Sequence, residues 1–364
     1  MKCRACDNPN RPGARYCQRC SAPLPVSCYG CGSPVRVDGE LCPACRTERV
    51  PVDVDADELF PDRPEAEVTS ITTIPYELRP AYTGREGALE TLLSAFEKAR
   101  DQNELAFVAL IGEPGMGKSR TIKEFARRLK KQDPDARFLI GAADPSGTPH
   151  AAFVQLLSTR FGAVVGDRGE DIREKIIAGI SEVLPADRVT EVAHLIAHLL
   201  RVPFDDSPVV TPLLETPQQL ETRTFIAVRR FLAADAEAGP LVLCFENLEH
   251  CGPETINLLH YLAAGLASSS IVILGTAASS LFERHPTFGG GEGRLVRIDI
   301  GPLSAGEAKQ LLRELCRPLD FVPERLVEHA QSLAGSPRAL FELVRLLLES
   351  DVIVRSGSLS WRID

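Results

Sequence analysis

The segment from Leu105 to Gln132 constrains this chain more than any other. Leu105 to Ile111 is an unbroken apolar run of strand length, and it leads directly into Gly112-Glu113-Pro114-Gly115-Met116-Gly117-Lys118-Ser119. This is a complete G-x-x-x-x-G-K-S loop, whose glycines allow successive backbone N–H groups to converge on an anion. Lys118 can reach the β and γ phosphates of a nucleotide, and the Ser119 hydroxyl can hold Mg²⁺.

The residues after the loop indicate a helix. Ile122, Phe125, Ala126 and Leu129 follow one another at helical spacing, so the loop opens a helix whose first N–H groups face the phosphates. We therefore predict a nucleotide site with a catalytic role for Lys118. The residues expected to hold the nucleotide are Gly112, Pro114, Gly115, Met116, Gly117, Lys118, Ser119 and Arg120.

Composition limits the class of protein. A chain of 364 residues with 44% hydrophobic and 25% charged residues predicts a soluble, globular protein of two or three domains. Its net charge of −9 argues against binding nucleic acid by bulk electrostatics. The sequence has no apolar run long enough to span a membrane and no signal peptide after Met1, so we expect a cytoplasmic protein without membrane insertion. In that reducing compartment, the eleven cysteines are better explained as metal ligands than as disulfides.

Eight of these cysteines form four C-x-x-C pairs near the N-terminus. The pairs make two units that repeat at an offset of 25 residues, and each unit can close a tetrahedral Zn²⁺ shell with no open position for catalysis. We therefore expect two structural Zn²⁺ ions, which supply most of the folding free energy of this segment. The predicted ligands are Cys3, Cys6, Cys17 and Cys20 in the first unit, and Cys28, Cys31, Cys42 and Cys45 in the second.

The charge of this segment bears on its partner. Residues 1–49 contain eight basic and four acidic side chains, and each Zn²⁺ with four thiolates carries two net negative charges, so the metal-bound module is close to neutral. Nucleic acid is therefore an unlikely ligand. The segment resembles the double zinc ribbons at the N-termini of many bacterial multidomain signalling proteins, which implies docking to a protein partner.

The rest of the chain alternates between strand and helix patterns. Apolar runs predict further strands at Arg137–Ala143, Leu241–Glu246, Ile271–Thr276 and Leu295–Ile300, and helical patterns lie between them, at 172–184, 188–200, 218–236 and 254–267. Such alternation predicts an α/β fold with a parallel sheet covered by helices. A terminal β-hairpin is expected over Val352–Ile363, with Trp361 packed against it.

Two turns elsewhere in the chain, one before the phosphate loop and one after it, also precede helical patterns. Gly84-Arg85-Glu86 precedes a helical pattern from Leu89 to Phe96, which Thr83 or Gly84 can cap. Gly335-Ser336-Pro337 begins a helix running to about Glu349, with Pro337 at its first position and Ser336 as its cap. Together with the phosphate loop, these turns resemble the AAA-like STAND ATPases, the signal-transduction ATPases with numerous domains, over about residues 82–351.

The resemblance has several implications. The fold is expected to be a parallel-sheet P-loop NTPase core with a small helical lid, preceded by the zinc-stabilised double ribbon. Gly84 and Arg85 would lie beside the adenine, and Pro337 would begin a lid helix near the nucleotide. The expected domains are the double ribbon at 1–48, an acidic Pro-rich linker at 49–80, the ATPase core at 81–300, and the lid with its hairpin at 301–364.

The sequence departs from this family where the third strand ends. The family places two acids there, one for Mg²⁺ and one that polarises the attacking water, whereas this chain has Glu246 and Asn247. Glu246 keeps a carboxylate for Mg²⁺ together with Ser119, but Asn247 cannot accept a proton, and the direction of Glu249 is open. Ala277 and Ala278 stand where the family often has an arginine. We therefore expect slow hydrolysis or none.

These observations favour an ATP/ADP-binding signalling or scaffold ATPase that uses Mg²⁺ and docks a partner protein through its ribbons. An active AAA-like remodelling ATPase and a nucleic-acid-binding regulator are the alternatives. In the resembled family a further domain follows the lid, whereas this sequence ends at Asp364. We therefore expect closure over the nucleotide to involve a partner or nucleotide-dependent self-association.

Overall fold

The computed structural model describes residues 80–164, 166–290, 295–317, 319, 321–332, 336–355 and 361–363, together with two short strands of the ribbon segment. Those strands, β1 (Val26–Ser27) and β2 (Pro34–Val35), pair antiparallel. The eight predicted zinc ligands and residues 49–79 of the predicted linker lie outside the described residues. The described chain contains a larger compact unit, Gly84–Leu303, and a smaller one that includes Ser304–Asp364.

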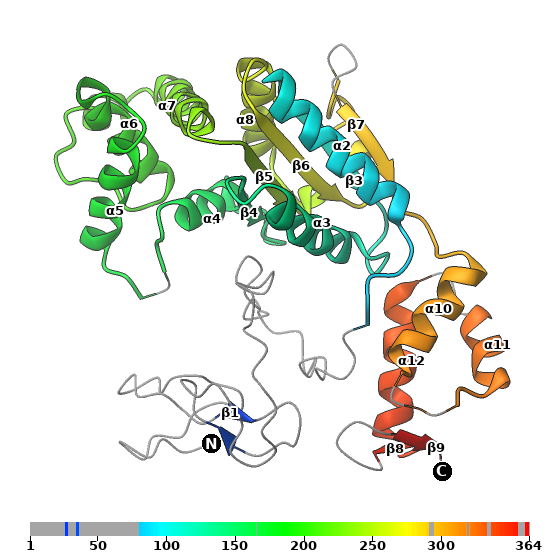
Figure 1. Ribbon diagram of the computed structural model, residues 1–364. Helices are drawn as coiled ribbons and strands as arrows, with labels where there is room; N and C mark the ends of the chain where they lie inside the picture. The colour runs from blue at the N-terminus through cyan, green and yellow to red at the C-terminus, as the bar shows by residue number, and fades with distance from the viewer. Residues whose placement is uncertain are drawn as a thin grey trace. The chain divides into compact units, whose positions relative to one another are not determined.

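A five-stranded parallel sheet forms the centre of the larger unit (Figure 1), with strand order β4-β5-β6-β3-β7. The prediction of a parallel sheet is confirmed, and every strand begins and ends within one residue of its predicted bounds. Both faces of the sheet are covered, which is why its central strands are apolar almost throughout. The strands are β3 (Ala106–Ile111), β4 (Arg137–Ala142), β5 (Leu241–Glu246), β6 (Ile271–Ala277) and β7 (Leu295–Asp299).

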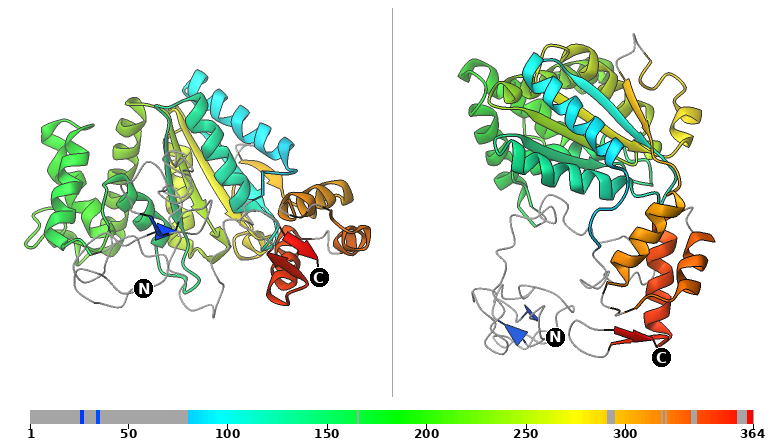
Figure 2. Two further views of the ribbon diagram at one scale, coloured as in Figure 1. Left: turned by 60° about the horizontal axis from the view of Figure 1, so that its bottom comes forward. Right: turned by 45° about the vertical axis from the view of Figure 1, so that its right-hand side comes forward.

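Helices pack on both faces of this sheet. Helices α2 (Glu86–Gln102) and α3 (Lys118–Gln132) lie side by side across one face (Figures 1 and 2), where Phe125 of α3 meets Phe138 of β4 edge-on at 6.1 Å. The main hydrophobic core covers the other face and includes side chains from α4 (Ala151–Arg160), α7 (Pro217–Glu237) and α8 (Pro253–Gly265). In that core, the rings of Phe153 and Phe245 are 4.8 Å apart.

The remaining helices of this unit are shorter or lie outside the sheet. Helices α5 (Gly169–Ser181) and α6 (Ala186–Leu199) contact each other beyond the β4 edge of the sheet, and α6 packs on α7 (Figure 1). Helix α4 was not predicted, because its ten residues are too short to give a clear helical period. Single-turn helices also escaped prediction: η2 (Thr211–Leu213), η3 (Leu248–His250) and α9 (Ser280–Arg284).

The smaller unit contains three helices and a hairpin in its described part. Ser304 caps α10 (Ala305–Leu315) by accepting from the Glu307 N–H, while the Glu307 carboxylate accepts from the Ser304 N–H at 2.8 Å. Helix α10 contacts α11 (Glu324–Ser332) and α12 (Pro337–Glu349), and Pro337 is the first residue of α12, as predicted. Strands β8 (Ile353–Arg355) and β9 (Trp361–Ile363) pair antiparallel with Trp361 buried, which confirms the predicted hairpin.

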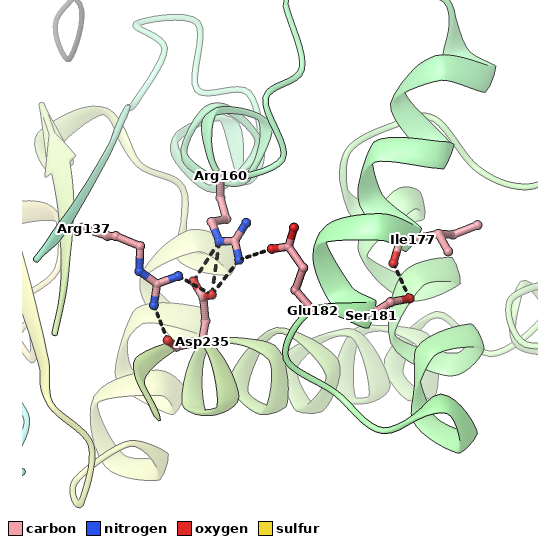
Figure 3. A network of polar contacts seen from close by, with 6 residues as sticks. All are labelled: Arg137, Arg160, Ile177, Ser181, Glu182 and Asp235. Carbon is pink, nitrogen blue, oxygen red and sulfur yellow. Dashed lines mark hydrogen bonds and ion pairs between the residues drawn. The ribbon is translucent and has the colours of Figure 1, made fainter. Parts of the chain in front are cut away.

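A buried ion network joins the β4 edge of the sheet to the helices beside it (Figure 3). Asp235 of α7 is fully buried, and its carboxylate accepts from Arg137 of β4 at 2.6 Å and from Arg160 of α4 at 2.8 and 3.0 Å. Arg160 also pairs with Glu182 at 3.4 Å, just after α5. One carboxylate thus ties a strand to two helices, and its loss would leave two arginines beside an apolar core.

We expect Asp235→Asn to lower the free energy of unfolding of the larger unit by about 3 kcal/mol, because removing one partner of a buried ion pair leaves uncompensated charge. Chemical denaturation followed by circular dichroism measures this loss. Asp299→Asn is the matched control, because Asp299 pairs with Arg297 at 2.7 Å on the surface, where such pairs contribute about 1 kcal/mol or less. Equal losses in the two variants would contradict a structural role for the network.

Candidate functional site

The candidate site lies at the carboxyl edge of the sheet, where three strands end. Strand β3 leads into the phosphate loop, β5 ends at Glu246, and β6 ends at Ala277. Strand β6 lies between β3 and β5 and runs parallel to both, so the ends of the three strands meet at one edge. This is the position at which open α/β sheets bind ligands.

The loop itself has the backbone conformation that its glycines permit. Gly115 and Gly117 have φ angles of 86° and 95°, a backbone conformation that is costly for residues with a side chain. Gly117 is the residue before α3, which begins at Lys118 as the sequence predicts. The N-terminal end of α3 therefore opens toward the loop, where the positive end of the helix dipole and its first N–H groups favour an anion.

Lys118 lies folded back on its own loop. Its ammonium group donates to the carbonyl of Gly112 and, at 3.3 Å, to that of Glu113. Burial lowers the pKa of Lys118, while the carboxylates of Glu249, Glu113 and Glu246 act in the opposite direction. The amine is thus held at the loop by weak acceptors that a phosphate can replace.

The two predicted magnesium ligands lie in direct contact. The Ser119 hydroxyl donates to a carboxylate oxygen of Glu246 at 2.9 Å. Both are hard oxygen ligands of the kind that Mg²⁺ prefers, and neighbouring ligands of an octahedral Mg²⁺, each at about 2.1 Å, lie about 3 Å apart. Ser119 and Glu246 would therefore suit Mg²⁺, which would supply positive charge to offset that of a bound phosphate.

The turn after β5 determines where the next side chains point. Asn247 has φ 58° and ψ 44°, a left-handed conformation that asparagine tolerates better than most residues. Its N–H donates to the Thr276 hydroxyl at 3.2 Å, which anchors the turn to the end of β6. The chain then enters η3, so that Glu249, whose direction the sequence leaves open, becomes buried.

The end of β6 provides no positive charge. Ala277 and Ala278 are both buried there, 0% and 7% exposed. Beyond them, the hydroxyl of Ser279, the N-cap residue of α9, donates to the Glu113 carboxylate of the loop at 2.6 Å, a contact that sequence reasoning missed. Hydroxyl-to-carboxylate contacts of this kind have no periodic sequence signal.

The turn at Gly84 and Arg85, predicted to lie beside the adenine, has a structural role in the described chain. Arg85, with φ 64°, is the N-cap residue of α2, so the expectation that Thr83 or Gly84 caps this helix is wrong. The Arg85 guanidinium donates to the carbonyls of Gly301 and Pro302, which ties the start of α2 to the segment after β7. Nucleotide contacts by Gly84 and Arg85 remain predictions. The same holds for Pro337, which belongs to the other unit.

No group of three or more histidine, cysteine or acidic side chains capable of holding a metal ion occurs among the described residues. Cys244, Cys251 and Cys316 are buried thiols. Burial raises the pKa of Cys251 and Cys316 to about 12, and that of Cys244 well above its ordinary value. These three cysteines are therefore unreactive core residues. They lie far along the chain from the C-x-x-C pairs of the N-terminal segment.

A buried strand, a G-x-x-x-x-G-K-S loop and a helix at the carboxyl edge of a parallel sheet define a P-loop nucleoside triphosphatase. Residues 82–274, more than half of the chain, match the model of the AAA ATPase domain. The chain therefore belongs to the AAA ATPase domain family, whose members bind ATP with Mg²⁺. Residues 3–46 match the double zinc ribbon, which confirms the predicted zinc-binding module.

Several solved structures are similar to this chain at low sequence identity. ORC1 of Aeropyrum pernix in complex with DNA is 14% identical, with a TM-score of 0.41, over 80% of this chain and 63% of that one. Drosophila ORC bound to DNA is 15% identical, with a TM-score of 0.42, over 82% of this chain and 61% of that one. PCH-2 of C. elegans is 14% identical, with a TM-score of 0.37, over 77% of this chain and 66% of that one.

The chain thus spans less than two thirds of the length of each of these relatives. No curated protein matches it. Within the described residues, every helix is too short or too polar to cross a membrane.

We expect Lys118→Ala to weaken binding of ATP and ADP tenfold to a hundredfold, because a charge-assisted phosphate contact contributes about 1.5 to 3 kcal/mol. Titration calorimetry with Mg²⁺ measures this change. Lys130→Ala, at the other end of α3, removes the same charge away from the loop and should leave affinity unchanged. Equal affinity in the Lys118 variant and the wild type would overturn the assignment of the loop.

Proposed function

We propose that this chain is an ATP- and ADP-controlled signalling or scaffold ATPase of the STAND type. The observation that carries this proposal is the combination of a complete phosphate site with an incomplete catalytic one. Ser119 and Glu246 are in contact as magnesium ligands, whereas Asn247, Ala277 and Ala278 stand where an active relative would have a carboxylate and an arginine. Such a site is expected to bind a nucleotide tightly and to hydrolyse it slowly.

The proposed organisation follows the sequence boundaries: a double ribbon at 1–48, a linker at 49–80, a core at 81–300 and a lid with its hairpin at 301–364. The division of the structure between Leu303 and Ser304 supports the last boundary. The ribbon is proposed to hold two Zn²⁺ ions and to dock a protein partner. Binding of ATP or ADP is proposed to change the state of the lid, and we propose that the protein acts in the cytoplasm.

Our expectation that the chain does not bind nucleic acid rests on charge alone. Two of the similar structures contain DNA, so the structural relatives give that expectation no support. The remodelling ATPase remains the other alternative, and rapid turnover would favour it.

Steady-state turnover beside calorimetry tests the hydrolysis part of this proposal. We expect tight nucleotide binding with slow turnover in the wild type, and at least tenfold faster turnover in Asn247→Asp, because this change adds a carboxylate in a left-handed position that aspartate also tolerates. Gln219→Glu, a comparable amide-to-acid change on α7, is the control. Fast wild-type turnover would reject the slow switch in favour of the remodelling ATPase.

Self-association is the second part of the proposal. The smaller unit exposes large apolar side chains, which is typical of surfaces that bind another protein. The exposed residues are Phe321 (73%), Leu346 (56%), Val352 (41%) and Ile363 (40%).

We therefore expect ATP to promote dimerisation more than ADP does, because a nucleotide shifts an equilibrium only through its differential affinity for the two states. Sedimentation velocity at several protein concentrations, with each nucleotide and with none, measures this effect. The double variant Phe321→Ser/Leu346→Ser should remain monomeric. A chain whose sedimentation is the same with ATP, ADP and no nucleotide would exclude self-association as the output of the switch.

A further inference from the structure

Glu249 is a buried carboxylate that phosphate binding by the loop does not explain. It follows the predicted magnesium ligand Glu246 by three residues and is only 8% exposed. Its Oε2 atom is buried and has no hydrogen-bond partner within the part of the chain that the structure describes. Leaving a carboxylate oxygen unsatisfied in the interior is costly, so an unexplained group of this kind indicates a role.

The short helix that carries Glu249 is held in place on three sides. Leu248 packs over Gly275 of β6 so closely that a Cβ atom at position 275 would lie 2.5 Å from the Leu248 Cδ1 atom. Thr276 accepts from the N–H of Asn247, and Arg284 donates to the main-chain carbonyl of Glu249 at 2.9 Å. The backbone that carries Glu249 is therefore held at the carboxyl edge of the sheet, and a catalytic group needs such a rigid support.

The charge of Glu249 acts on the phosphate loop. Among the carboxylates that raise the pKa of Lys118, Glu249 has the largest effect, ahead of Glu113 and Glu246. Lys118 is the side chain that contacts the γ-phosphate in a loop of this type. Glu246, three residues before Glu249, contacts Ser119, the residue after Lys118, so Glu249 lies close to the loop at the same edge of the sheet.

We propose that Glu249 is the catalytic carboxylate of this site and takes the place of the acid that Asn247 lacks. Its carboxylate orients a water molecule and accepts a proton from it as the water oxygen forms a bond to the γ-phosphorus. The bond between that phosphorus and the β–γ bridging oxygen breaks, and ADP leaves with the electron pair. Glu249 then returns the proton to the released phosphate or to solvent. This inference rests on the proposed function, because it requires that the loop bind ATP.

The test compares Glu249→Gln with the wild type in two measurements. We expect turnover to fall about a hundredfold, within the range that a general base contributes. We also expect ATP affinity to rise about threefold or more while ADP affinity changes less, because the variant removes a negative charge beside the γ-phosphate. Glu254→Gln is the matched control: it makes the same change on the exposed first turn of α8 and should alter neither quantity.

Several outcomes would overturn the proposal. These are unchanged turnover in Glu249→Gln, a loss of ATP affinity in that variant, or wild-type turnover no higher than that of Lys118→Ala. A second variant, Glu249→Asp, retracts the carboxylate by one methylene and should lose at least tenfold in turnover with unchanged ATP affinity. Full activity in that variant would also count against Glu249. A wild-type chain that fails to bind ATP in calorimetry would instead refute the proposed function itself.

Discussion

Burial of β3, β5 and β6 on both faces of the sheet is the constraint on which the site depends. Side chains of these strands are almost all fully buried, and each buried Val, Leu, Ile or Phe contributes roughly 1.5 to 3 kcal/mol. Because the three strands are parallel neighbours, this packing sets the relative heights of their carboxyl ends. The contact between Ser119 and Glu246 is therefore a consequence of how the hydrophobic core packs these strands.

One residue converts this shared edge into a site with unusual chemistry. Asn247 leaves β5 in a left-handed conformation and directs the chain into η3. An asparagine serves this turn better than most residues would, but it cannot act as a base. The same turn buries Glu249 near the loop, so the residue that removes a carboxylate from the usual position also places another one close by.

Much of the fold could be predicted from the sequence, because both its strands and its phosphate loop leave strong local signals. The apolar runs gave all five strands, and the G-x-x-x-x-G-K-S pattern gave the start of α3 at Lys118. Other features depend on contacts between distant segments. Arg85, the N-cap of α2, donates to the carbonyls of Gly301 and Pro302, and Phe153 of α4 packs on Phe245 of β5. The direction of Glu249 depends likewise on Gly275, Thr276 and Arg284, which lie 26 or more residues away along the chain.

Phosphate binding and hydrolysis impose different physical demands on this edge. Binding needs backbone N–H groups, one lysine and two metal ligands, all of which are supplied by segments that the core holds rigidly. Hydrolysis also needs charge stabilisation and proton transfer that strengthen as the reaction proceeds, and the segment proposed to supply them here is η3. Ala277 and Ala278 contribute no charge, so η3 is left to supply the chemistry. Because η3 and the phosphate loop are separate segments, a substitution in η3 would alter the rate of hydrolysis without changing the backbone of the loop.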